Sequence, residues 1–438
     1  MGQSTKLDVD LIVVEETDGV DLLVDLRAAE VVVDDAVGAQ TVVVVLDRSG
    51  SMAGEPLTAA RKAISTLVGR LRPKDRFGLV VFDDTADLVV PTAPLEVLGA
   101  AQVQAAVHQV ARGGTTDLSA GYALGLSEAG RAKGPNGATL VIVSDGHANA
   151  GERSSDRLAQ LARAKAGAGV TTTTIGLGLG YDDELLAALA KGGNGNQVFA
   201  EGLDDLVPAL TDQVAGLLTK AVTATSVTIR PRGCEPSGIR VLHDYPTAWL
   251  GDELLVHLGD LAGGDTRKVL VELDLPDVAA LGVQTVAEVV VRYTPVPELE
   301  ESSLTLPVTV NLVPGEQPPA RLSADALYAE RSLQQAQSSK RAAIAAMREG
   351  RAQEAEAILS EASERLGSAI EGLPEELRGT LEEDRTELRH LASLAAEREV
   401  ERTVKTAYES MTSMGRSRPM PRRGPRRARS RESSDEVR

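Results

Sequence analysis

The first half of the chain alternates between strand-like runs of apolar and β-branched residues and segments with helical spacing. The runs are TVVVVL from residue 41, FGLVVF from residue 77, ATLVIV from residue 138 and VTTTTIG from residue 170. Between the first two runs, apolar side chains recur at three- and four-residue steps from Leu57 to Leu67, and Pro56 suits the first turn of a helix. Apolar strands that alternate with helices predict an α/β unit, a doubly wound and mostly parallel sheet, over residues 39–219.

The segments on either side of this unit have the spacing of β-strands instead. Residues 221–313 contain six short strand candidates between Pro and Gly turns, which is typical of a β-sandwich. Residues 7–14 and 20–27 alternate apolar and polar positions around the turn-like EETDG, so they predict a strand pair. We expect this pair, within residues 1–36, to join the sandwich at residues 220–316, with the α/β unit inserted in it. An independent hairpin packed on the α/β unit is the alternative.

The last part of the chain changes composition twice. Residues 320–414 are rich in Ala, Glu, Leu, Arg and Gln at helical spacing, interrupted at GLPEEL, which predicts a helical hairpin or bundle. Residues 415–438 carry nine arginines against three acids and offer little apolar surface to bury, so this basic tail is expected to be disordered. The whole chain has a net charge of −18, so the +6 of the tail leaves −24 on the rest. Such an acidic body repels nucleic acid, and only the tail is suited to tether the chain to nucleic acid or an anionic surface.

Cysteine usage and hydropathy bear on the compartment. The only cysteine, Cys234, excludes an intrachain disulfide and favours a reducing compartment. The opening residues, MGQSTKLDVDLIVVEE, lack the basic and apolar regions of a signal peptide, and no run of about 18 apolar residues could span a membrane. We therefore expect a soluble cytoplasmic protein without a membrane span, and the Ala, Val, Gly and Arg bias suggests a bacterial source.

Polar residues gather where the predicted strands end. Asp47, Ser49 and Ser51 follow the first apolar run without a spacer, GGTTD occupies residues 113–117, and SDG occupies residues 144–146. In an open parallel sheet the carboxyl ends of the strands meet at one edge, where ligands bind. The carboxylates and hydroxyls of these loops form an oxygen-only donor set. Such a set suits Mg²⁺, Mn²⁺ or Ca²⁺ rather than zinc.

The three motifs DRSGSM, GGTTD and SDG, in this order and at these separations, resemble the metal-ion-dependent adhesion site of a von Willebrand factor A (VWA) domain over residues 40 to about 219. By this resemblance the metal-site residues are Asp47, Ser49, Ser51, Thr115 and Asp145. The resemblance makes Ser49, Ser51 and Thr115 direct ligands, while the aspartates act directly or through water. The longer segments VVLDRSGSMAGEPL, GGTTDLSAGYALGL and SDGHANAG resemble a bacterial subgroup related to the inter-alpha-trypsin-inhibitor heavy chains.

The resemblance implies a binding protein rather than an enzyme, in which an Asp or Glu of a partner protein completes the coordination of Mg²⁺. AAA+ ATPases and components of stress or conflict systems are candidate partners, and nothing in the residues selects among them. The alternative is a metal-dependent phosphohydrolase. It is disfavoured because an aspartyl-phosphate enzyme would have an acid at Ser49, and because no GxSxG, HExxH or Walker GK[ST] motif occurs.

Several of these residues also have a purely structural interpretation. Asp47, Ser49 and Ser51 could form an Asx-type turn or a helix cap, although the co-occurrence of all three loops favours a metal site. Thr116 and Asp117 precede a helical segment and are expected to cap it. His147 is left outside the site. Arg48 either shapes partner preference or forms a surface salt bridge.

Overall fold

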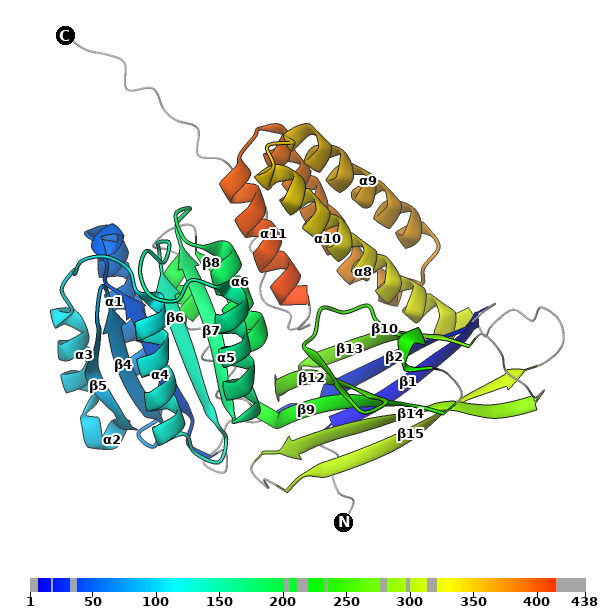
Figure 1. Cartoon of the computed structure of the whole chain (residues 1–438), viewed down its shortest axis with the longest axis horizontal. Coiled ribbons are helices and arrows are strands. Elements are labelled where there is room, and N and C mark those ends of the chain that lie inside the picture. The colour runs from blue at the N-terminus through cyan, green and yellow to red at the C-terminus, as the bar shows by residue number, and fades with distance from the viewer. Residues whose placement is uncertain are drawn as a thin grey trace, which may run out of the picture.

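The computed structural model shows an α/β unit, a β-sandwich and a helical bundle packed against one another (Figure 1). The described residues are 7–16, 19–31, 38–200, 205–210, 220–232, 235–275, 282–296, 300–312 and 321–414. The predicted fold class is confirmed in each of these three parts. The basic tail at 415–438 lies outside the described residues, so its expected disorder stays a prediction.

The α/β unit is built on a six-stranded sheet of order β5-β4-β3-β6-β7-β8. Its strands are β3 (Thr41–Asp47), β4 (Arg76–Phe82), β5 (Ala86–Pro94), β6 (Ala138–Ser144), β7 (Val170–Leu177) and β8 (Asn194–Ala200). All neighbouring pairs are parallel except β4 and β5, which are antiparallel. Antiparallel strands can follow each other through a tight turn, whereas parallel strands need a crossover. Because β3, β4, β6 and β7 are parallel to one another, their carboxyl ends share one edge of the sheet.

Helices cover both faces of this sheet. They are α1 (Glu55–Val68), α2 (Leu95–Leu98), α3 (Ala100–Gln109), α4 (Leu118–Ala132), α5 (Ser155–Gly167) and α6 (Asp183–Gly192). Val42 and Val44 of β3 pack in the core that α1 and α3 share, whereas Val43 and Val45 pack in the core formed with α4, α5 and α6. Alternate side chains of a strand point to opposite faces, so a strand covered on both sides is apolar at every position.

The β-sandwich has two antiparallel sheets, ordered β1-β2-β13-β10 and β11-β12-β9-β14-β15. The strands are β1 (Leu7–Glu16), β2 (Gly19–Ala28), β9 (Lys220–Pro231), β10 (Ile239–Val241), β11 (Thr247–Leu250), β12 (Glu253–Ala262), β13 (Thr266–Asp274), β14 (Gly282–Pro295) and β15 (Ser302–Leu312). Because β2 pairs with β13 along its whole length, the amino-terminal strands belong to the sandwich and the α/β unit is inserted between β2 and β9. The short strand β11 was not predicted, since its Trp249 and Leu250 are exposed and give no alternation.

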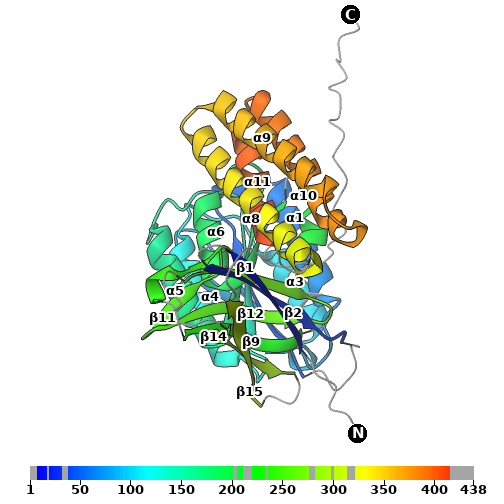
Figure 2. The same ribbon diagram turned by 90° about the vertical axis from the view of Figure 1, so that its right-hand side faces the viewer.

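The carboxyl-terminal helices form a four-helix bundle rather than a hairpin. They are α8 (Arg321–Arg348), α9 (Ala352–Glu371), α10 (Glu375–Ala396) and α11 (Val400–Met414). The break between α9 and α10 falls at GLPEEL, where Pro374 is the residue that precedes α10. Figure 2 shows the bundle on one side of both the sandwich and the α/β unit. Within the described ranges, no helix combines the length and the apolar character needed to cross a membrane.

Buried polar groups join the bundle to the other two units. The fully buried Lys405 of α11 donates to the carbonyl oxygen of Tyr181 at 3.1 Å, and its ammonium lies 4.2 Å from the centre of the Tyr181 ring. On the sandwich side, Nε2 of His243 lies 3.0 Å from a carboxylate oxygen of Glu330 in α8. The amide of Leu270 donates to Nδ1 of His243, so the proton of the ring is on Nε2 and is donated to Glu330. A hydrogen bond to a carboxylate is costly to lose when both partners are buried, because the remaining group is left without a partner.

Glu330 gives this contact a predictable pH dependence. Burial alone would raise the pKa of Glu330, but the hydrogen bond from His243 and the charge of Lys268 lower it from 4.5 to about 2. The ionised carboxylate therefore stabilises the fold fully above pH 4.5, and this contribution is lost as the pH falls toward 2. We expect Glu330→Gln to lower the free energy of unfolding by about 2–3 kcal/mol at pH 7, with the difference from wild type shrinking below pH 4.5.

Urea titrations of both proteins between pH 7 and pH 3 measure this difference. Glu364→Gln, at an exposed position on α9, is the matched control and should lie within about 0.5 kcal/mol of wild type throughout. A Glu330→Gln deficit that stays constant down to pH 3 would contradict the assignment.

Candidate metal site

The site is centred on Asp47, the last residue of β3. Its side chain is fully buried, and both carboxylate oxygens accept hydrogen bonds. Ser144 at the end of β6 donates to Oδ2 at 2.7 Å, and the amide of Ser49 donates to Oδ1 at 2.8 Å. The bond from Ser144 is possible because the carboxyl ends of β3 and β6 lie side by side. These bonds offset part of the cost of burying a carboxylate in an apolar sheet.

Three more of the predicted residues surround this carboxylate. The hydroxyls of Ser49 and Ser51 are 3.1 Å apart, and Ser51 donates to Oδ1 of Asp145 at 2.7 Å. Ser49 is buried, Asp145 is half-buried and Ser51 is exposed. The oxygens of Asp47, Ser49, Ser51 and Asp145 therefore form a chain that rises from the interior of the sheet to the surface.

Thr115 comes from the GGTTD loop, which is fixed to the Asp47 loop by backbone bonds. The amide of Gly113 donates to the carbonyl of Arg48 at 2.7 Å, and the amide of Gly50 donates to the carbonyl of Gly114 at 2.9 Å. Thr115 follows Gly114 directly and is exposed. The structure thus places all five predicted residues at one edge of the sheet, Asp47 at the end of β3 and the other four on loops.

The capping predictions in the same loop have different outcomes. Asp117 caps α4, because its Oδ1 accepts from the amide of Ala120 at 3.0 Å. The prediction for Thr116 was wrong. This residue lies one position too early to cap α4. It is buried, and its carbonyl accepts from the amides of Asn149 and Ala150.

Two groups at this edge were not predicted from the sequence. The sequence marks Ser144 only as the start of SDG, yet its hydroxyl donates to the carboxylate of Asp47. Asp83 follows β4 directly and pairs with Arg48, Nε to Oδ2 at 3.1 Å, while a second nitrogen of Arg48 lies 2.6 Å from Asp87. Arg48 is thus engaged in salt bridges, one of its two predicted roles. The sequence signal that could have identified Asp83 is its position, because Asp83 and Asp84 directly follow the apolar run FGLVVF just as Asp47 ends its own strand.

His147 lies at the margin of this group. Its ring is largely exposed, and Nδ1 lies 3.8 Å from a carboxylate oxygen of Asp182 at the start of α6. The ion-pair distance given for His147 is therefore to the start of α6.

The electrostatics of the two site carboxylates favour a cation. Burial raises the pKa of Asp47, opposed by the hydrogen bonds of Ser144 and Ser49 and reinforced by the charge of Asp83. Burial also raises the pKa of Asp145, to which the charge of Asp47 adds. A raised pKa means that the negative charge of each carboxylate is held at a cost, which a bound cation would relieve.

The donor set discriminates among the metals that it could hold. Carboxylate and hydroxyl oxygens are hard ligands, and the site combines two of the former with three of the latter. Across the described residues no group of three His, Cys, Asp or Glu side chains is arranged to hold an ion. Zinc favours nitrogen and sulfur ligands, which none of the five site residues supplies, so their oxygen donors fit Mg²⁺, Mn²⁺ or Ca²⁺ better than zinc.

This fold and site define a class of protein. An α/β sheet with DxSxS, a threonine loop and SDG at its carboxyl edge is the arrangement of a metal-ion-dependent adhesion site. The sequence profile of the von Willebrand factor type A domain matches residues 41–213. The chain therefore contains a VWA domain, flanked by the sandwich and followed by the helical bundle. VWA domains bind a divalent metal at this site, and many use it to bind other proteins.

Comparison with known proteins gives relatives of two kinds. The chain is 24% identical over 288 residues to an uncharacterized protein of Synechocystis sp., covering 63% of this chain and 66% of that protein. It is 25% identical over 134 residues to the inter-alpha-trypsin inhibitor heavy chain H1 of Mesocricetus auratus, covering 28% of this chain and 14% of the heavy chain. The chain thus spans just under two thirds of the first relative and a small part of the second.

A solved structure extends the likeness in fold to nearly the whole chain. The von Willebrand factor type A protein from Catenulispora acidiphila superposes with a TM-score of 0.70 and 14% identity, covering 89% of this chain and 91% of that one. At this identity the likeness concerns the fold alone. It shows that the combination of the VWA domain with the surrounding units is shared with another protein.

Asp83 and Asp87 allow a matched test of how Arg48 holds the site loops. Asp83 is 6% exposed, whereas Asp87 is 56% exposed. Burial opposes a low pKa for Asp83, but bonds from the Thr85 amide and the Arg48 guanidinium lower it, so its charge stabilises the fold. We expect Asp83→Asn to lower the free energy of unfolding in EDTA by about 1–2 kcal/mol, and Asp87→Asn by less than about 0.5 kcal/mol. Equal effects in urea titrations would contradict this ranking.

Proposed function

We propose that the protein is a metal-dependent protein-binding module. Asp47, Ser49, Ser51, Thr115 and Asp145 hold a Mg²⁺ ion, and an Asp or Glu side chain of a partner protein binds to it. When bound, the ion supplies a positive charge at the surface of an otherwise acidic protein. The observation that carries this proposal is the graded chain of oxygens from the buried Asp47 to the exposed Ser51.

The gradient in burial supports a docking role. Asp47 would supply buried negative charge to the ion, whereas the hydroxyls of Ser49 and Ser51 are neutral and would add no charge. Two carboxylates only just balance a divalent cation, and Mg²⁺ readily keeps open positions that water or an acidic side chain can occupy. A partner carboxylate could thus take one of these open positions and complete the coordination of the ion.

We further propose that the site binds and does not catalyse. Both carboxylates accept hydrogen bonds from serines and are assigned to the metal, so the proposal leaves neither of them to act as a general base. His147, the nearest histidine in sequence, is directed to Asp182. Metal-assisted hydrolysis also needs a positioned water or nucleophile beside the ion, and these contacts provide no group to activate one.

The metal itself gives a test with a distinctive sign. Burial raises the pKa of Asp47 in the folded protein. In the absence of a cation, the fold therefore loses stability as the pH rises above the pKa that Asp47 has in the unfolded chain. We therefore expect Asp47→Asn to be no less stable than wild type in EDTA at pH 7. Addition of Mg²⁺ at about 100 times its dissociation constant should stabilise wild type by about 2.7 kcal/mol and leave the variant unchanged.

Thermal or urea unfolding with Mg²⁺, Mn²⁺, Ca²⁺ or EDTA measures both effects. Asp252→Asn, which removes an exposed acid on a turn of the sandwich, should respond to the metal as wild type does. An equal response of Asp47→Asn to Mg²⁺ would place the ion elsewhere.

Partner recognition can be tested before the partner is identified. Random peptides displayed on phage and selected on the wild-type protein in Mg²⁺ should converge on sequences with an Asp or Glu. Replacement of that acid by its amide should weaken binding at least tenfold, as should EDTA or Asp47→Asn. Peptide binding that survives both EDTA and Asp47→Asn would overturn the metal-dependent mode. In the same preparations we expect no turnover of p-nitrophenyl phosphate in Mg²⁺.

A further inference from the structure

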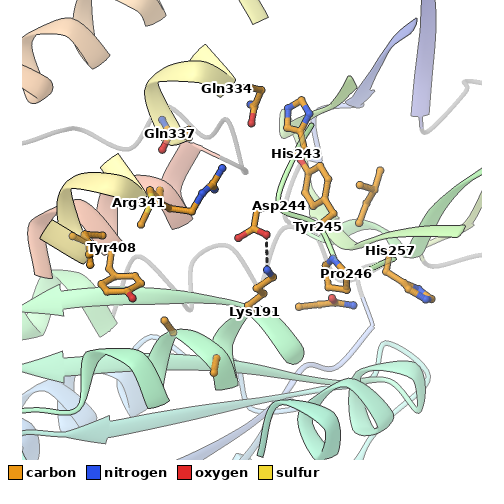
Figure 3. Close-up of a pocket in the computed structure, with 18 of the residues that line it drawn as sticks. Lys191, His243, Asp244, Tyr245, Pro246, His257, Gln334, Gln337, Arg341 and Tyr408 are labelled. Carbon is orange, nitrogen blue, oxygen red and sulfur yellow. Dashed lines mark hydrogen bonds and ion pairs between the residues drawn. The ribbon is translucent and has the colours of Figure 1, made fainter. Parts of the chain in front are cut away.

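A cavity of about 500 Å³ lies where the three units meet (Figure 3). The α/β unit contributes the end of α6 and the start of β8, the sandwich contributes the loop between β10 and β11, and the bundle contributes α8 and α11. Since α6 leads from the carboxyl end of β7 to the amino end of β8, its last turn lies at the opposite edge of the sheet from Asp47. The cavity is therefore separate from the metal site.

The charged side chains of the cavity are predominantly basic. Lys191, Arg341 and Arg348 line it together with a single acid, Asp244, on a protein whose net charge is −18. Lys191 is 2.5 Å from Asp244, and Arg348 binds two acids outside the cavity lining, Asp183 at 2.8 Å and Glu184 at 3.1 Å. The lining thus contains more cationic than anionic groups.

Arg341 differs from the other two cations. Among the described residues, no carboxylate or other acceptor lies within ion-pair or hydrogen-bond distance of its guanidinium group. Figure 3 shows the side chain reaching from α8 into the space that Asp244 and Lys191 also face. A guanidinium presents a planar fork of donors that matches a carboxylate or a phosphate, so its pairing capacity is open to a ligand.

The wall of the cavity on the sandwich side is a fixed aromatic surface. The rings of Tyr245 and His243 are stacked, with centroids 5.4 Å apart and planes at 12°. Both ring nitrogens of His243 form hydrogen bonds, one with Glu330 and one with the Leu270 amide. These two bonds fix the ring on which Tyr245 stacks. Ala187, Ile344 and Met411 add apolar surface. Small-molecule sites commonly combine such apolar walls with a few convergent polar groups.

We propose that this cavity binds a small organic anion of about nucleotide size. Its phosphate or carboxylate group binds Arg341 and Lys191, and its flat ring lies against Tyr245. Charge complementarity selects the anionic group, and the fixed aromatic wall selects the ring. Such a ligand touches all three units, so its binding stabilises their junction. The proposal is independent of the metal site and of any protein partner.

Isothermal titration of the full chain in EDTA tests the proposal, since the chelator keeps anions from binding through a metal. The probes are adenosine 5′-monophosphate and 2-naphthoate, which carry a ring with a phosphate or a carboxylate. Adenosine lacks the anion and inorganic phosphate lacks the ring. We expect at least one of the two anionic ring compounds to bind at one site per chain, at least tenfold more tightly than adenosine or inorganic phosphate. Which of the two binds more tightly identifies the anionic group.

Variants locate the binding. Arg341→Gln should weaken the bound probe at least tenfold, and Arg341→Lys should restore part of the affinity because the charge remains without the fork. Arg389→Gln, an exposed arginine on α10, is the matched control and should bind as wild type does. The proposal is overturned if neither anionic ring compound binds, or if Arg341→Gln binds the probe as tightly as wild type.

Discussion

The buried carboxylate of Asp47 is the constraint on which the carboxyl edge of the sheet depends. A strand that is apolar on both faces ends in an acid with no exposed surface. That acid must find partners within a few ångströms, and it does so through Ser144 of the neighbouring strand and the amide of Ser49 in its own loop. The loop after β3 is consequently turned back over the sheet, which brings Ser51 to Asp145. The buried carboxylate thus links β3, β6 and the loop after β3 at this edge of the sheet.

The insertion of the VWA domain in the sandwich explains why the protein has extensive junctions. The chain enters and leaves the domain through strands of one sandwich, β2 and β9, so the domain is tied to it at both ends. The bundle then covers the junction with buried polar contacts, those of Lys405 with Tyr181 and of Glu330 with His243. Such contacts specify one arrangement more strictly than apolar surfaces do, because a shift of either partner leaves a buried group unsatisfied.

The parts of the structure that the sequence predicts are those encoded by local periodicity. Strand β3 could be predicted because TVVVVL is an almost unbroken apolar run, and Asp47, Ser49 and Ser51 could be placed at its end by their position in the chain. Ser144 could not be identified as the partner of Asp47, because that pairing depends on β3 and β6 being neighbours. The same holds for Arg48 and Asp83, which meet only because β4 lies next to β3.

Long-range pairing accounts for the remaining differences. Strand β11 escapes prediction because its Trp249 and Leu250 are exposed, so their hydrophobicity does not reflect burial. The basic cavity could not be predicted at all, since Arg341 and Tyr245 lie on separate units and nothing in their local sequence relates them. The cavity forms only when the three units pack together, so no single stretch of sequence indicates it.

Helix α6 connects the two edges of the VWA sheet. At its first turn Asp183 binds Arg348 of the bundle, and at its last turn Lys191 binds Asp244 of the sandwich. Just before the helix, Tyr181 accepts the hydrogen bond from Lys405, and Gly180 lies against the backbone of Asp145. One helix therefore carries contacts to both neighbouring units while its first turn adjoins the site loop. The ion pairs at the two ends of α6 thus add to the insertion in the sandwich and to the contact of Lys405 with Tyr181 in joining the metal-site edge to both neighbouring units.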